Sequence, residues 1–176
     1  MRTLRLNLLA TLVALGLALA AAHGASAATK DVLLPEDGLV KAIKHYRATT
    51  RTLQGVMGRR VRYARLRAVS LRQARNVWHH RAVATRERFL RGPAHRSAWL
   101  CIHRYEGAWT DGGGPYYGGL QMDIGFQSSY GSALLDTKGT ANHWSPLEQM
   151  WIAERAYRSG RGFYPWPNTA RYCGLI

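Results

Sequence analysis

A helical repeat of apolar residues, set among arginines, occupies residues 39–90 and limits the folds open to this chain. Leu39, Ile43 and Tyr46 recur at spacings of four and three, which places them on one face of a helix. The pattern therefore predicts a long helical segment with one apolar side. The further members of the repeat are Leu53, Val56 and Met57, then Val61, Ala64, Ala68 and Leu71, and finally Val77, Trp78, Phe89 and Leu90.

The ends of this segment are marked by breaker residues and by charge. Gly55 and Gly58 predict a break, because each glycine costs roughly 1 kcal/mol inside a helix. Arg91-Gly92-Pro93 predicts its end, because proline cannot continue a helix. Residues 36–96 carry sixteen Lys/Arg and three acidic residues, a balance of +13, whereas residues 97–176 carry six of each. We therefore expect a basic helical arm over residues 39–96 and a separate domain over residues 97–176.

The charge of the arm suggests a partner. A surplus of +13 would attract an acidic lipid surface, nucleic acid or the anionic polymers of a bacterial wall. The alternative is a solvated spacer whose arginines keep it soluble. Residues 1–27 have the pattern of an export signal. Anionic wall polymers or a membrane surface are therefore favoured as partners of residues 39–96, and nucleic acid is not expected.

The first 27 residues have the pattern of a secretory signal peptide. Arg2 and Arg5 precede an uncharged apolar run, and Ala25-Ser26-Ala27 offers a cleavage site of small residues. A retained membrane anchor is the alternative. Residues 28–38 then form a linker, in which Asp37 is expected to cap a helix beginning near Gly38. The chain is expected to be secreted, in or at a bacterial cell wall.

Cys101 and Cys173 are the two cysteines of the chain. In an oxidising compartment an even pair favours a disulfide. Two free thiols or a nucleophilic cysteine are the alternatives, but neither cysteine has a basic partner at a catalytic spacing. A disulfide would tie the beginning of the most unusual stretch of the chain to its C-terminus.

That stretch, residues 99–123, places a lone carboxylate among aromatic residues and glycines. Trp99, Ile102 and Tyr105 share a spacing of three and predict the buried face of a short helix. Glu106 then ends this helix, since Gly107 follows it. A carboxyl group among aromatic rings, beside a loop that lets backbone approach a ligand, favours chemistry on a sugar.

The rest of the domain is predicted to be mainly α-helical. Tyr116-Tyr117-Gly118-Gly119-Leu120 suggests a short β-hairpin, and a helix is expected over about 124–135. Ser145-Pro146-Leu147-Glu148 is a strong start for another helix, reaching about Ser159. The aromatic, Pro-rich tail is expected to be an irregular strap.

These motifs resemble the transglycosylase-like domain of resuscitation-promoting factors, in the lysozyme-like superfamily. The resemblance covers about 97–173. It rests on Trp99 and Cys101, on Tyr105-Glu106-Gly107-x-Trp109, on Tyr116-Tyr117-Gly118-Gly119-Leu120-Gln121-Met122, on the helix from Ser145 to Ala156, and on Cys173 in its Trp/Pro-rich tail. In that family a cysteine and a serine commonly flank the glutamate, where this chain has Tyr105 and Gly107. The resemblance implies a small lysozyme-like fold that acts on the amino-sugar strands of peptidoglycan.

The resemblance also implies roles for residues. Glu106 occupies the position of the family's catalytic glutamate, and Gln121 the position of a glutamine that lines the family's substrate cleft. Tyr117 is expected to orient the sugar with Gln121, and Trp109 and Tyr116 to supply aromatic surface. A lytic transglycosylase needs one carboxylate, which first protonates the glycosidic oxygen and then takes a proton from the sugar's own 6-hydroxyl. No cofactor or metal is expected.

Other readings remain open. A muramidase would use water and a second carboxylate. Asp111 and Asp123 are the candidates, although a turn role for Asp111 and a turn or helix-cap role for Asp123 are favoured. His103, three residues before Glu106, has a smaller claim to a role. A third reading is a wall-binding module that has lost activity and docks through its basic arm.

Overall fold

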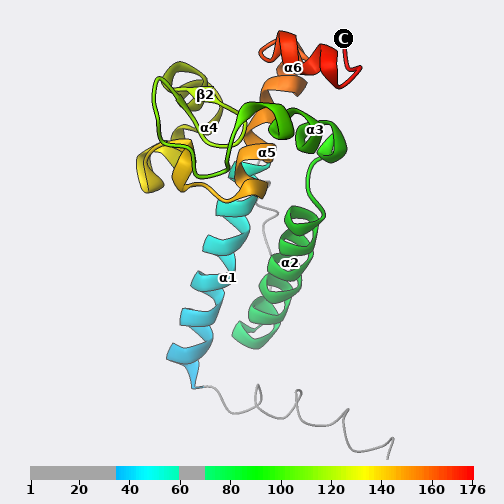
Figure 1. Cartoon of the computed structure of the whole chain (residues 1–176). Helices are drawn as coiled ribbons and strands as arrows, with labels where there is room; N and C mark the ends of the chain where they lie inside the picture. Colours follow the sequence, from blue (N-terminus) through cyan, green and yellow to red (C-terminus); the bar gives the residue numbers. More distant parts are fainter. Residues whose placement is uncertain (1–34, 60–69) are drawn as a thin grey trace, which may run out of the picture.

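The computed structural model describes residues 35–59 and 70–176, which form a mainly α-helical protein with one small β-hairpin (Figure 1). This confirms the predicted fold class, a helical domain with a short hairpin preceded by a helical arm. The elements are α1 (Glu36–Val56), α2 (Leu71–Arg91), α3 (Arg96–Glu106), β1 (Tyr116–Tyr117), β2 (Met122–Asp123), α4 (Ile124–Lys138), η2 (Ala141–His143), α5 (Pro146–Ala156), η3 (Tyr157–Arg161) and α6 (Pro167–Tyr172).

Several predictions concern residues outside the described ranges. They include the signal peptide at 1–27, most of the linker at 28–38, and the apolar positions Val61, Ala64 and Ala68. Within the described ranges, no helix has the length and apolar character needed to cross a bilayer.

Helices α1 and α2 form the arm, and both point their C-terminal ends toward the rest of the molecule (Figure 1). The predicted break is confirmed, since α1 ends at Val56 and Gly58 has φ +64°. The predicted end of the second helix at Arg91 is confirmed too. The expected cap at Asp37 is wrong. The helix begins two residues before Gly38, extended Pro35 precedes it without a side-chain cap, and Asp37 instead lies in the first turn.

The two helices pack through a mixed aromatic and cationic seam. Trp78 is buried on α2, and the guanidinium carbons of Arg47 and Arg81 lie 5.4 and 5.1 Å from its ring. Tyr46 of α1 packs edge-on against His79 at 5.1 Å. Arginines of the arm therefore cover aromatic surface as well as carrying charge.

Backbone carbonyls at the C-terminal ends of both arm helices accept hydrogen bonds from side chains of α5 and η3. Arg158 donates to the carbonyl of Met57 at 2.7 Å, and Arg155 to that of Gly55 at 3.3 Å. Trp151 Nε1 donates to the carbonyl of Phe89 at 3.1 Å. The carbonyls of Gly55 and Phe89 also accept from the backbone N–H groups of Gly58 and Gly92, at 3.0 Å each, so the side chains supply second donors there. Helix α1 has no basic residue in its last turn. The side chains of α5 and η3 thus complete the ends of the arm.

The arm and the domain also share one hydrophobic core. Val56 at the end of α1 and Met57 directly after it are buried in the same cluster as Trp99, Ile102 and Ile152. Burial lowers the pKa of the Arg155 guanidinium, with Arg158 adding to the effect, which reflects how closely this junction is packed. Helices α1 and α2 therefore pack against the domain, and their removal would expose part of its core.

The domain begins with a buried polar junction. Glu154 of α5 is 2% exposed, accepts a hydrogen bond from Trp99 Nε1 at 3.0 Å, and lies 3.2 Å from His95 Nδ1. His95 directly precedes α3, so this carboxylate fixes the start of the helix that ends in Glu106. A buried carboxylate needs such partners to offset the loss of water.

The remaining elements follow local signals. β1 and β2 form an antiparallel pair in which Tyr116 faces Asp123, as the hairpin prediction required. Ser145 and Glu148 form a capping box at the start of α5. The prediction that the C-terminal tail is an irregular strap is wrong. It contains the short helix α6, because Pro167 occupies a first helical position that tolerates its missing N–H and fixed φ.

The predicted disulfide is confirmed. Cys101 of α3 bridges Cys173 at the end of α6, across 72 positions of sequence. Replacing both by serine is expected to lower the free energy of unfolding by about 2–4 kcal/mol, since the bridge restricts the unfolded chain. Chemical denaturation of the double variant measures this change. A loss below about 0.5 kcal/mol would show that α6 is held by its packing alone, because surface substitutions commonly fall in that range.

Candidate active site

Glu106 is the last residue of α3, and its carboxylate is half-buried. Its Oε1 accepts a hydrogen bond from the hydroxyl of Thr169 at 2.7 Å. Thr169 lies on α6 and is 8% exposed, so the tail reaches back to hold this carboxylate. Within the described ranges Oε2 has no hydrogen-bond partner. One oxygen of Glu106 is thus fixed by the protein and the other is available.

Gly107 ends α3 and lets two side chains come close to Glu106. A Cβ at Gly107 would lie 3.0 Å from Gln121 Nε2 and 3.2 Å from Asp111 Oδ2. These two groups are themselves bonded, since the Gln121 amide donates to Asp111 at 2.9 Å. The stretch that begins with α3 therefore folds back so that Gln121 lies beside the end of the helix.

Gln121 adopts a conformation that few residues other than glycine adopt. Its φ is +46°, and its amide nitrogen also donates to the carbonyl of Gly118 at 3.0 Å. The preceding Gly118-Gly119 turn leaves no room for side chains. A Cβ at Gly118 would collide with the amide of Gln149, and a Cβ at Gly119 would lie 2.6 Å from Trp109 and from His103. Backbone strain of this kind is often kept where a ligand binds.

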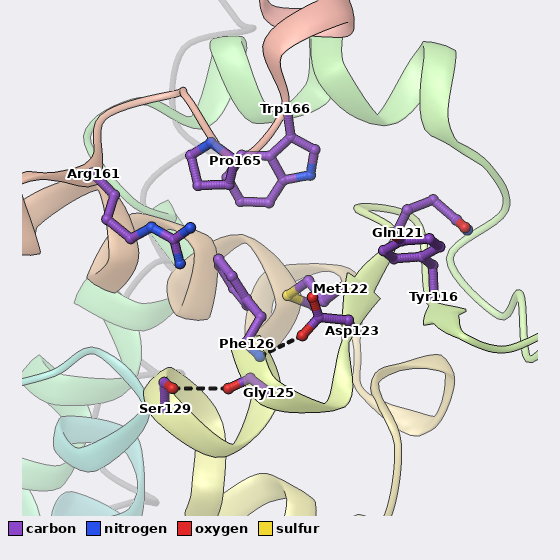
Figure 2. Close-up of a pocket in the computed structure, with 10 residues that line it drawn as sticks. All are labelled: Tyr116, Gln121, Met122, Asp123, Gly125, Phe126, Ser129, Arg161, Pro165 and Trp166. Carbon is purple, nitrogen blue, oxygen red and sulfur yellow. Dashed lines mark hydrogen bonds between the residues drawn. The ribbon is translucent and has the colours of Figure 1, made fainter.

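A pocket of about 380 Å³ opens next to this turn. Trp166 and Pro165 form one wall, Phe126 lies across from them, and Tyr116 and Gln121 close one end (Figure 2). The Trp166 ring is fixed by a hydrogen bond from Nε1 to the carbonyl of Leu120 at 2.6 Å. The complete lining is Tyr116, Gln121, Met122, Asp123, Gly125, Phe126, Ser129, Arg161, Pro165 and Trp166.

Glu106 is not a lining residue of this pocket but adjoins it. Its partner Thr169 also reaches the carbonyl of Trp166 at 3.4 Å, and its neighbour Gly107 approaches Gln121. Gln121 and Trp166 both line the pocket. Glu106 is thus connected to the pocket through contacts of Gly107 with Gln121 and of Thr169 with Trp166.

The other aromatic residues of the predicted site lie elsewhere. Trp109 stacks on His103 at 3.9 Å, and the carbonyl of Gly119 lies 3.1 Å from His103 Nδ1, so both rings support the turn. The hydroxyl of Tyr117 lies against Gly114 in the glycine-rich loop. Of the four residues expected to bind substrate, the structure thus brings Gln121 and Tyr116 to the pocket and leaves Trp109 and Tyr117 outside its lining.

The predicted burial of Tyr105 is wrong. Its side chain is 54% exposed and lies near Tyr172, whereas Trp99 and Ile102 are fully buried. A step of three residues falls about 60° short of a full helical turn, so two steps carry Tyr105 well away from the face of Trp99. Tyr105 therefore does not enclose Glu106.

The two other carboxylates of the stretch are occupied. Asp111 accepts from the backbone of Gly113 at 3.1 Å as well as from Gln121. Asp123 caps α4 by accepting from the backbone of Phe126 at 2.6 Å. This confirms the turn role for Asp111 and the helix-cap role for Asp123. Among the described residues Asp111 has both oxygens engaged, whereas Asp123 and Glu106 each have one oxygen without a hydrogen-bond partner; of these two, Glu106 has no turn or cap role.

Two residues that matter to the site were not predicted. Thr169 lies in a segment expected to be irregular. Gln149 is fully buried on α5, accepts from the backbone of Gly119 at 2.8 Å and donates to the carbonyl of Trp109 at 2.8 Å. The sequence does contain a signal for Gln149, a polar residue directly before the apolar run Met150-Trp151-Ile152-Ala153.

Comparison with known proteins adds no family assignment, because no family model, curated protein or solved structure matches this chain. The function is therefore inferred from the geometry of Glu106 and its surroundings.

Proposed function

We propose that this protein is a secreted enzyme that cleaves the glycan strands of peptidoglycan, with Glu106 as its single general acid and base. The observation that carries the proposal is the carboxylate itself. One oxygen is held by Thr169 and the other is uncommitted, and the group adjoins a pocket walled by aromatic rings. Aromatic faces are suited to packing on sugar rings.

The chemistry follows from having one carboxylate in this stretch, Glu106, that serves neither a turn nor a helix cap. The protonated Glu106 donates its proton to the glycosidic oxygen as the bond to the anomeric carbon breaks. The resulting carboxylate then takes the proton of the sugar's own 6-hydroxyl, whose oxygen bonds to the anomeric carbon. The product is a 1,6-anhydro ring, and Glu106 ends protonated again. No water is consumed, and the internal hydroxyl has the advantage of proximity.

Hydrolysis in the usual way would need a second carboxylate to activate water or form a covalent intermediate. Asp111 and Asp123 are engaged in a turn and a helix cap. This favours the lytic transglycosylase over the muramidase. The test is mass spectrometry of the soluble fragments that the protein releases from purified wall. Anhydro ends are expected, and reducing ends alone would contradict the proposal in favour of hydrolysis.

A wall-binding role through the arm is favoured by a separate observation. Lys41, Lys44, Arg86 and Arg88 are all exposed on α1 and α2. Such a surface would hold the enzyme on anionic wall polymers or at a membrane surface. If the wild-type protein sediments with wall but releases nothing, this binding role alone would remain.

Replacing Lys41, Lys44, Arg86 and Arg88 together by glutamine is expected to weaken binding to wall about tenfold at low salt, because each exposed charge pair contributes roughly 0.2–1 kcal/mol. The difference should disappear at about 1 M salt, where charges are screened within a few ångströms. Cosedimentation at both salt concentrations measures this. These substitutions leave the junction with α5 intact, which deletion of the arm would not. Equal binding by both proteins at low salt would assign the arm a purely structural role.

A further inference from the structure

Three arginines follow one another along α5 and η3, and they have different surroundings. Arg155 and Arg158 donate to the carbonyls at the end of α1. Arg161, at the end of the π-helical turn η3, lines the pocket beside Glu106 instead. The two cations that hold the arm are thus distinct from the one that faces the pocket.

The backbone around Arg161 explains its position. Gly160 has φ +98° and Gly162 has φ +56°, so the chain reverses on both sides of this residue. The guanidinium carbon of Arg161 lies 6.0 Å from the ring centroid of Phe126. The pKa of the Tyr130 phenol is lowered, chiefly by its hydrogen bond with Ser159 and further by Arg161, which places the guanidinium close to that hydroxyl.

The charge of Arg161 is not neutralised by the protein. Within the described ranges no carboxylate lies within ion-pair distance of it. Asp123 lines the same pocket, but it lies beside Met122, with Phe126 between it and Arg161 (Figure 2). The pocket therefore has a positive end at Arg161 and a negative group near the end formed by Gln121.

We infer that Arg161 forms a subsite for a carboxylate carried by the glycan, with the sugar ring lying between Trp166 and Phe126. This inference rests on the proposed function and specifies the substrate class: a strand that bears free carboxylates, as the lactyl groups of muramic acid do where no peptide is attached, rather than a neutral amino-sugar polymer. The planar guanidinium matches a carboxylate in two parallel hydrogen bonds. Asp123 repels the same group from the other end, so the charges fix the direction of the strand.

The test measures binding of the full chain carrying Glu106→Gln, so that neither probe is cut. One probe is a neutral oligomer of N-acetylglucosamine, and the other is a peptide-free glycan strand of equal length with lactyl carboxylates. The carboxylated probe is expected to bind roughly tenfold more tightly, as a charge-assisted hydrogen bond in a partly exposed site allows. Adding Arg161→Gln should abolish this preference while leaving the affinity for the neutral probe within about twofold, since that probe has no charge to pair.

Arg171→Gln is the matched control, because Arg171 is an exposed arginine of α6 outside the pocket lining. It should keep the full preference. Arg161→Lys should keep part of it, since the charge remains but the planar pair of donors is lost. Equal binding of both probes, absence of binding to either, or an unchanged preference in Arg161→Gln would overturn the subsite. Fragment release by the wild-type protein is measured in a separate experiment. If the Arg161 subsite is contradicted, the proposed cleavage is still tested by that release.

Discussion

Replacing Glu106 by glutamine is expected to reduce the release of soluble fragments from purified wall by about 10²–10⁴-fold or more, the contribution of a positioned proton donor. The amide keeps the size of the side chain and can still accept from the hydroxyl of Thr169. It cannot give a proton to the glycosidic oxygen or take one from the 6-hydroxyl. Because both steps use the same group, the substitution should lower the turnover rate and leave binding of the wall unchanged. Fragment release against time, at saturating wall, measures it.

Two other carboxylate variants serve as controls, because they test whether the loss is particular to Glu106. Asp136→Asn removes an exposed acid of α4 and should leave the rate unchanged. Asp123→Asn keeps the helix cap, because asparagine caps as well as aspartate, and should change the rate by no more than a few-fold. A loss in Asp123→Asn as large as that in Glu106→Gln would indicate a two-carboxylate mechanism. Full release by Glu106→Gln would contradict the proposed mechanism outright.

The parts of the fold that could be predicted are those with local signals. The capping box at Ser145, the helix end at Gly92 and the break at Gly58 depend on residues a few positions apart, and all are present. The helical arm also follows from spacing alone. For these helices and caps the physical cause lies within one segment of the sequence. The disulfide was predicted differently, from the cysteine count and the expected export signal, although its two residues lie 72 positions apart.

The parts that could not be predicted depend on contacts between distant segments. The two arm helices meet α5 and η3 through Trp151, Arg155 and Arg158. No spacing in the sequence links these three residues to their partners Phe89, Gly55 and Met57. Thr169 reaches Glu106 across 63 positions.

In the candidate site, too, some features follow from local sequence and others depend on distant segments. The motifs placed Glu106 and Gln121 in one stretch, and the structure brings the Gln121 amide to Gly107, the residue after Glu106. The pocket lining required the tail, which brings Pro165 and Trp166, and the π-helical turn, which brings Arg161. Trp109 is an aromatic residue near Glu106 in sequence, yet its ring supports the turn from behind. Proximity in sequence therefore predicted which segment carries the site, but not which side chains face the ligand.

Gln149 is the residue on which the folded-back turn most depends. Its Oε1 accepts from the backbone of Gly119 at 2.8 Å. Its Nε2 lies 2.8 Å from the carbonyls of Trp109 and Ala141 and 3.0 Å from that of Trp144. An amide has two N–H groups, so three carbonyls share them. A single side chain thus connects the loop after α3, the turn before Gln121 and the 3₁₀ helix η2.

Gln149→Leu is expected to lower the free energy of unfolding by about 3–5 kcal/mol. Leucine fills a similar volume but leaves the N–H of Gly119 and the carbonyl of Trp109 buried without partners, and each such group costs about 1–3 kcal/mol. Denaturation by urea, read as the shift in midpoint at constant slope, measures the loss. Met150→Leu, at the next position of α5 and also buried, should cost less than about 1.5 kcal/mol because it conserves volume.

The same substitution separates packing from positioning. Gly119 lies two residues before Gln121, so a loosened turn should displace the Gln121 amide from Asp111 and from the end of α3. Fragment release by Gln149→Leu, measured at a temperature where the variant is still folded, should therefore fall about tenfold or more, as small misplacements of a positioned group do. Met150→Leu should keep the wild-type rate under the same conditions. If Gln149→Leu loses less than about 1 kcal/mol of stability and retains full release, the hydrogen bonds of this amide do not hold the turn, since a typical net hydrogen bond is of that size.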